Sequence, residues 1–219
     1  MKRRWLRVAG GLLVAVGLFK VVAAVAVPLA YTGWTRVPAV TVVSAAGDPR
    51  IPAVRAAVAR WNQTFAELGT PFRLGDVTLV TGSVPEGDLR GLAVRLPRSL
   101  FSVTLPASVD RFPGDLLVVL SDANFISFMA RGSQRKLIGV KNGAAWPLTL
   151  PNVLPNVIAH ELGHAVGLPH NDDPRLLMCG RPAPCRPDAF QSDTPHFFPL
   201  SAGEKDRLRA LYPSSWAAK

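Results

Sequence analysis

Three of the four histidines in this 219-residue chain fall within the eleven residues HELGHAVGLPH, which run from His160 to His170. If this stretch begins as a helix, His160 and His164 lie one turn apart on the same face, so that two imidazoles can bind one metal ion. Glu161 projects to the side of that face, where it can take a proton from a water without being a ligand. These residue types therefore predict a metal centre beside a carboxylate base.

The third histidine reaches the same ion only if the helix ends before it. A continued helix would rotate His170 about 240° away from His164. Gly167 can take a positive φ and end the helix, and Pro169 disfavours its resumption. We therefore expect the chain to turn back at Gly167 and to bring His170 to the ion. Three imidazoles and an open fourth position form the ligand set of a catalytic zinc, which polarises a carbonyl and lowers the pKa of a water. The expected reaction is amide hydrolysis, with Glu161 as the general base.

The longer pattern His-Glu-x-x-His-x-x-Gly-x-x-His, followed by Met178 eight residues after the last histidine, is the metzincin signature. HELGHAVGLPHNDDPRLLM resembles the active-site segment of the matrixins, the matrix-metalloproteinase-like branch of the metzincins. FPLSAGEKDRLRALYP (198–213) and VRAAVARWNQTFAELGTPFRL (54–74) are similar to the last and first matrixin helices. The resemblance implies a zinc endopeptidase acting on protein or peptide substrates, in which Met178 forms a hydrophobic floor beneath the three histidines. The alternative for Met178 is an ordinary core methionine.

The resemblance also implies the fold class, which is α+β of the zincin-like kind. It has a twisted, mostly parallel five-stranded sheet with an antiparallel edge strand that bounds the cleft. Two helices, including the active-site helix, pack behind the sheet, and a small C-terminal subdomain after Gly167 ends in a helix. Only His196 lies outside the motif, so the second, structural zinc site of vertebrate matrixins is not expected, and no calcium-binding loop is evident. We interpret His196 as a surface or packing histidine and expect one zinc ion.

Hydrophobic spacing predicts the elements that position these residues. Strands are expected at 37–45, 77–80, 89–96 and 115–122, with a glycine-broken edge strand at 137–146. Helices are expected at 51–69, 152–167 and 201–212, the last opened by a capping box of Ser201 and Glu204. Residues 171–200 are expected to form a long loop. A substrate strand is expected to pair with the edge near residues 137–141 through backbone hydrogen bonds.

Residues 1–30 have the pattern of an export segment, with a basic start, an apolar run and small residues. Val8–Ala30 is long enough to span a bilayer, but Lys20 interrupts it, so that a cleaved signal peptide and an uncleaved signal anchor are both open. We expect two parts, an export segment at 1–30 and a catalytic domain at 31–219. The catalytic domain is expected outside the cell or at its surface, with membrane contact only through the N-terminal segment.

Charge and cysteine content restrict the partners and the compartment. The net charge is +10, but residues 1–30 hold five basic and no acidic residues, which leaves 20 basic against 15 acidic residues and a net charge of +5. No basic run with interleaved aromatics is present, so a nucleic-acid partner is not expected, and we expect a monomer. Cys179 and Cys185 lie six residues apart, and in an exported chain we expect a disulfide, with two free thiols as the alternative.

Two other functions are consistent with the same residues. The first is a peptidase of narrow specificity that processes one partner at the cell surface. The second is a membrane-anchored module that binds the metal with little or no turnover. Glu161 is the residue that distinguishes an enzyme from such a module, because a binding module needs the ligands and not the base.

Overall fold

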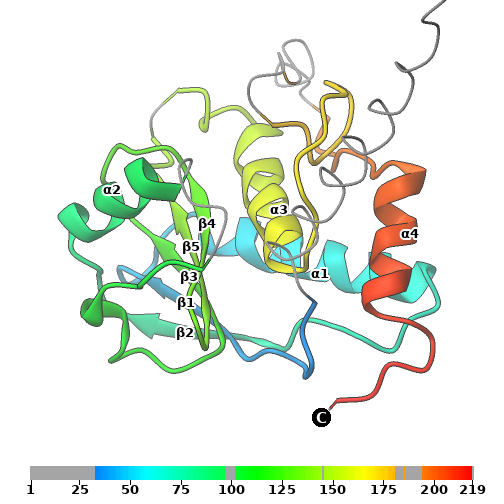
Figure 1. The fold of residues 1–219 in the computed structure, drawn as a ribbon. Coiled ribbons are helices and arrows are strands. Elements are labelled where there is room, and N and C mark those ends of the chain that lie inside the picture. Colours follow the sequence, from blue (N-terminus) through cyan, green and yellow to red (C-terminus); the bar gives the residue numbers. More distant parts are fainter. Residues whose placement is uncertain (1–32, 97–101, 145, 181–184, 186–193, 219) are drawn as a thin grey trace, which may run out of the picture.

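The protein's structure is a computed structural model, in which helices cover both faces of a five-stranded sheet (Figure 1). The structure describes residues 33–96, 102–144, 146–180, 185 and 194–218. The expected export segment at 1–30 lies outside these residues. Along the described part of the chain, no helix combines the length and the apolar character that crossing a bilayer requires.

The sheet has the strand order β2-β1-β3-β5-β4. Its strands are β1 (Val40–Ser44), β2 (Val77–Thr81), β3 (Leu116–Leu120), β4 (Phe128–Arg131) and β5 (Lys136–Val140). Strands β2, β1, β3 and β5 are parallel to one another, and β4 runs antiparallel to β5 at one edge. The structure thus confirms the expected α+β class, with a mostly parallel five-stranded sheet and an antiparallel edge strand.

All residues of β1, β3 and β5 are buried, as is usual for parallel strands whose two faces are both covered. Figure 1 shows α1 (Ile51–Glu67) and α3 (Val153–Ala165) on one side of the sheet and α2 (Glu86–Arg95) on the other. Alternate strand residues face the two sides, so that Val118 belongs to the core beneath α1 and α3 while Val119 belongs to the core beneath α2. The two helices expected behind the sheet are therefore α1 and α3.

The C-terminal helix α4 (Ala202–Leu211) lies beyond α1 and α3, away from the sheet (Figure 1). It opens with the predicted capping box, in which the Ser201 hydroxyl accepts from the backbone of Glu204 and the Glu204 carboxylate accepts from the backbone of Ser201. Helices α1, α3 and α4 confirm the three predicted helices, each ending one or two residues earlier than expected.

The prediction of a strand at 89–96 is wrong, because these residues form most of α2. Leu89 and Leu92 are three residues apart, which places both on one helical face, and both are fully buried against the sheet. Glu86 in the first turn and Arg95 in the last turn complement the helix dipole. The helical spacing of Leu89 and Leu92 is present in the sequence, but a short apolar segment that contains Gly91 is also consistent with a strand.

The prediction of an edge strand at 137–146 is also wrong. The strand there is β5, which lies between β3 and β4, and the residues after Val140 leave the sheet. Gly139 does not mark an edge: a methyl group on it would lie 2.7 Å from the Phe128 ring, so the glycine makes room for the neighbouring strand. The edge on this side is β4, which the sequence did not predict. The expected docking edge for a substrate therefore moves from residues 137–141 to β4.

Candidate metal centre

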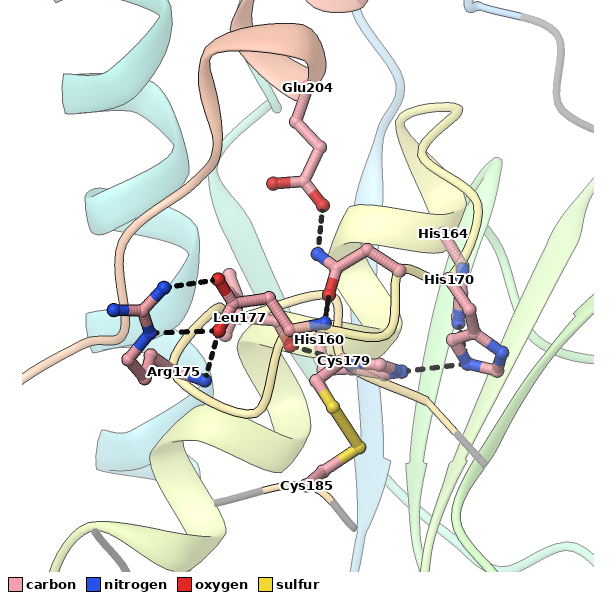
Figure 2. Close-up of a disulfide and its surroundings, with 10 residues drawn as sticks. His160, His164, His170, Arg175, Leu177, Cys179, Cys185 and Glu204 are labelled. Carbon is pink, nitrogen blue, oxygen red and sulfur yellow. Dashed lines mark hydrogen bonds and ion pairs between the residues drawn. A yellow bond between two sulfur atoms is a disulfide. The ribbon is translucent and has the colours of Figure 1, made fainter. Parts of the chain in front are cut away.

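Helix α3 brings the first two histidines of the motif to one face, and the segment after it brings the third (Figure 2). The Nε2 atom of His170 lies 3.1 Å from Nε2 of His160 and 2.9 Å from Nε2 of His164. One nitrogen of each ring lies within 4.8 Å of the other two. The structure therefore gathers all three predicted ligands, which come from positions up to ten residues apart in the chain.

The outer nitrogens of two of these rings determine which nitrogen faces the centre. Nδ1 of His160 lies 2.8 Å from the carbonyl oxygen of Leu177, and Nδ1 of His164 lies 2.7 Å from that of Leu168. A carbonyl only accepts, so each Nδ1 carries the proton and donates, which leaves the Nε2 lone pair directed inward. Burial and the neighbouring His160 and His170 rings lower the pKa of His164 well below its ordinary value, which keeps it neutral. The converging neutral imidazoles fit a zinc ion.

The turn that brings in the third histidine has the form of a Schellman motif. Gly167 has a φ of 106°, in the region that only glycine occupies without strain. The N–H of Leu168 donates to the carbonyl of Gly163 at 2.9 Å, and the N–H of Gly167 donates to the carbonyl of His164 at 3.1 Å. The helix ends at this glycine, as the sequence predicted, and the chain reverses toward the cluster.

Two other glycines allow side chains of the centre to approach the backbone closely. A methyl group on Gly163, between the two helical histidines, would lie 2.3 Å from the sulfur of Met178. Met178 is fully buried and packs directly against this turn of α3. A methyl group on Gly180 would lie 2.2 Å from Cγ of His170. Gly163 and Gly180 are therefore the positions where any side chain would displace Met178 or His170.

The segment after His170 is closed on itself and anchored to α4 (Figure 2). The N–H of Asn171 donates to the carbonyl of Met178, and the N–H of Gly180 donates to the carbonyl of Asn171. A disulfide joins Cys179 to Cys185. The Asn171 amide also donates to the Glu204 carboxylate at 2.6 Å, so that the capping box of α4 holds the chain directly after the third histidine.

The Glu161 side chain lies toward the edge strand β4. Burial raises the pKa of its carboxyl to about 8, and a hydrogen bond from the backbone of Met129 opposes this shift. Met129 is part of β4, so the carboxyl lies between the active-site helix and the edge of the sheet. A carboxyl group whose pKa is near neutrality can both take up and release a proton at physiological pH.

Two asparagines that the sequence analysis did not consider fix the start of α3 to a distant segment. The side chain of Asn156 accepts from the N–H of Phe198 at 2.9 Å and donates to the carbonyl of His196, and the side chain of Asn152 accepts from the N–H of His196. The repeat in PNVLPNV (151–157) placed both asparagines on one helical face and was the available signal. The His196 side chain is exposed and lies outside the cluster.

No family model and no curated protein sequence matches this chain. Among solved structures, the chain is similar to an archaemetzincin from Methanopyrus kandleri, with 18% sequence identity and a TM-score of 0.42 over 83% of this chain and 96% of that one. It is also similar to a chain in a chaperone–substrate complex, with 14% identity and a TM-score of 0.46 over 86% of this chain and 36% of that one. Neither likeness is close enough to carry a function to this chain, so its function must be argued from the geometry of the centre.

Proposed function

We propose that this protein is a zinc-dependent endopeptidase. The observation that carries the proposal is the convergence of the His160, His164 and His170 Nε2 atoms, with Nδ1 of the first two held by backbone carbonyls. Zinc bound by three neutral imidazoles supplies Lewis acidity toward a carbonyl and acidifies a water. The narrower assignment to the matrixins is supported by the sequence resemblance alone.

In this proposal the chain's own groups divide the work of hydrolysis. The three imidazoles would hold the ion, which would be accessible to the substrate and to water. The Glu161 carboxylate takes the proton of the attacking water and passes it to the nitrogen of the departing amine, so that no proton is lost or gained overall. Burial of Glu161 between α3 and β4 keeps this transfer away from bulk solvent.

The substrate is a peptide in extended conformation that pairs with the edge strand β4. An edge strand presents backbone donors and acceptors to which a further strand can add. At the far end of this edge, the carbonyl of Arg131 accepts from the N–H of Val103 at 2.8 Å. We therefore place the substrate along the first half of β4, beside Met129, where Glu161 also lies.

The protein acts outside the cytoplasm in this proposal. Two observations support this location: the export pattern of residues 1–30, and the pairing of Cys179 with Cys185, since disulfides persist mainly in oxidising compartments. Cell fractionation with an antibody against the chain tests it, and recovery of the whole protein from the cytoplasmic fraction would refute it.

The function is tested by metal analysis combined with cleavage of a peptide library. We expect about one zinc per chain, loss of most of the metal in His170→Ala, and no loss in the matched control His196→Ala, whose histidine lies outside the cluster. Peptide cleavage should stop on addition of a chelator and return with zinc. A wild-type chain that binds zinc and cleaves no peptide would favour the metal-binding module instead.

A further inference from the structure

Three consecutive backbone carbonyls at the end of the active-site helix each accept a hydrogen bond from a side chain of a different part of the fold. Lys136 of β5 donates from Nζ to the carbonyl of Ala165 at 2.6 Å, and the Tyr212 hydroxyl donates to that of Val166 at 3.0 Å. Arg207 of α4 donates from Nε to the carbonyl of Gly167 at 2.8 Å. These residues are 29, 46 and 40 positions from their partners in the chain.

The carbonyls at the end of any helix lack partners within the helix, and water usually supplies them. Here two of the three donors are buried: Lys136 has a relative exposure of 7% and Tyr212 of 0%. Lys136 also lies with its Nζ 4.3 Å from the centre of the Trp34 ring, and the Tyr212 hydroxyl accepts from the N–H of Trp34. Lys136 and Tyr212 are therefore held in place by contacts other than those with the turn.

The three carbonyls belong to Ala165 and Val166, which immediately precede the bend toward His170, and to Gly167, where the chain bends. Gly167 is the flexible point of that bend, because a glycine can take several backbone conformations at little cost. If the bend were free, binding a metal through His170 would require ordering it, and the lost entropy would weaken the binding. Side chains that hold the carbonyls before the bend reduce this cost in advance.

We propose that Lys136, Arg207 and Tyr212 are positioning residues of the metal centre, which fix the backbone at Ala165–Gly167 and thereby hold His170 where it can complete the ligand set. The proposal rests on the proposed metal binding of this cluster and deepens it. According to this proposal, residues of β5 and of the C-terminal segment, which lie outside the motif HELGHAVGLPH, contribute to the metal affinity.

The first arm of the test measures zinc affinity by competition with a chelator of known affinity. We expect Arg207→Met, Tyr212→Phe and Lys136→Met each to raise the dissociation constant for zinc about 10- to 100-fold. This range is typical for residues that orient metal ligands without binding the metal. Arg209→Met is the matched control, since Arg209 lies on the same helix, is exposed and pairs with Asp206. Circular dichroism and the melting temperature of the metal-free proteins show whether each variant is folded. Tyr212→Phe keeps the buried ring and removes only the hydroxyl.

The second arm asks whether these residues act through His170. In a His170→Ala background, Arg207→Met should no longer change zinc affinity, because the ligand it positions is absent. The visible spectrum of bound cobalt gives a second readout: Arg207→Met should shift the wild-type spectrum toward that of His170→Ala, and Arg209→Met should leave it unchanged.

The outcomes separate this proposal from the proposed function. Equal zinc affinities in Arg207→Met and Arg209→Met, or an equal loss from Arg207→Met with and without His170, would overturn the positioning role while metal binding by the histidines stands. A wild-type chain that binds no zinc would overturn the proposed function, and the positioning role with it. Loss of affinity that requires His170 would establish the role.

Discussion

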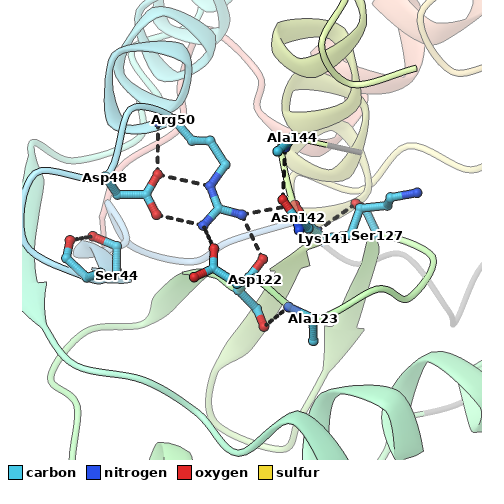
Figure 3. A network of polar contacts seen from close by, with 11 residues as sticks. Ser44, Asp48, Arg50, Asp122, Ala123, Ser127, Lys141, Asn142 and Ala144 are labelled. Carbon is cyan, nitrogen blue, oxygen red and sulfur yellow. Dashed lines mark hydrogen bonds and ion pairs between the residues drawn. The ribbon is translucent and has the colours of Figure 1, made fainter. Parts of the chain in front are cut away.

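Two buried polar clusters in this protein differ in where their charges and lone pairs point. At the carboxyl ends of β1 and β3, the Arg50 guanidinium donates to both carboxylate oxygens of Asp48, to Asp122 and to the carbonyls of Ser121 and Lys141 (Figure 3). Burial acts to raise the pKa of Asp48, but the hydrogen bonds and charge of Arg50 outweigh it and hold the pKa below its ordinary value. This cluster satisfies its own charges.

The histidine cluster is arranged in the opposite way. The outer nitrogens of His160 and His164 donate to backbone carbonyls, and the inner nitrogens of all three rings converge on one point. Burial raises the pKa of the neighbouring Glu161 carboxyl to about 8. A positive ion at that point would be attracted to the lone pairs and would lower that pKa. A buried polar cluster whose groups neutralise one another therefore indicates a structural role, whereas one whose lone pairs converge on a common point indicates a ligand-binding site.

The largest expected effect that distinguishes the two clusters is on the rate of peptide hydrolysis. Glu161→Gln should leave zinc content unchanged, because the three histidines remain, while peptide hydrolysis falls by about 10²- to 10⁴-fold for want of the general base. Glu86→Gln, at an exposed glutamate of α2, is the control and should hydrolyse at the wild-type rate. Initial rates on a quenched peptide give the measurement. Near-wild-type hydrolysis by Glu161→Gln would mean that another group is the base.

Removing Arg50 from its cluster should lower the free energy of unfolding without changing metal binding. Arg50→Met leaves the Asp48 carboxylate buried without its cation, which typically costs about 3–5 kcal/mol. The control Arg60→Met removes a partly exposed arginine of α1, the helix that Arg50 immediately precedes, and its pair with Glu67 is worth at most about 1 kcal/mol. Urea unfolding of the metal-free proteins measures both. Zinc content of the folded Arg50→Met protein should stay at one per chain, and a loss of zinc there would show that the two clusters are not independent.

The buried amine of Lys136 should make the free energy of unfolding depend on pH. Burial, and secondarily the charge of Arg131, lower the pKa of Lys136 to about 7, whereas the unfolded chain keeps the ordinary value of 10.5. Between these values the unfolded state binds more protons, so stability rises with pH. From pH 8 to 10 the gain should be roughly 2–3 kcal/mol. Glu161, with a folded-state pKa of about 8, and Tyr212, whose folded-state pKa is raised above its ordinary value of 10.0, keep their protons longer in the folded state and therefore oppose part of this gain at the two ends of the window.

Denaturant unfolding of the metal-free protein at several pH values measures this slope, and Lys136→Met should abolish it. Arg50→Met should keep the slope, since it leaves Lys136 and its buried surroundings in place. A wild-type stability that is flat or falls between pH 8 and 10 would contradict a lowered Lys136 pKa.

The smallest expected effect belongs to the disulfide. Because the loop between Cys179 and Cys185 is short, replacing both by serine should cost only about 2 kcal/mol. The loss should be visible as a lower melting temperature, with the Arg50 cluster unaffected. Alkylation followed by intact-mass measurement checks the pairing itself, and two alkylated thiols in natively exported protein would refute it.

The structure was most predictable from the sequence where the determining contacts are local. The two helical histidines, the Gly167 turn and His170 lie within eleven residues, so helical geometry and glycine chemistry were sufficient to bring them together. Helix α1 was predictable because its apolar face repeats over 17 residues. Only four residues make up β4, and its identity as a strand depends on its pairing with β5, which no local pattern records.

A different reason explains why the positioning residues could not be predicted from the sequence. Lys136, Arg207 and Tyr212 donate to backbone carbonyls, and every residue offers a carbonyl, so that nothing in the sequence marks the partner. Arg207 and Lys136 resembled ordinary surface charges in the sequence. Their roles follow only from the three-dimensional packing of α4 and β5 against the end of α3.

The dependence of the third ligand on α4 bears on the order of events during biosynthesis. The motif is complete once His170 has been made, but Arg207 and Tyr212, which hold the preceding turn, are made later. A nascent chain that ends before α4 thus carries the three histidines without the framework that fixes them. We expect such a chain to bind zinc weakly, so that high metal affinity arises only after Arg207 and Tyr212 have joined the fold.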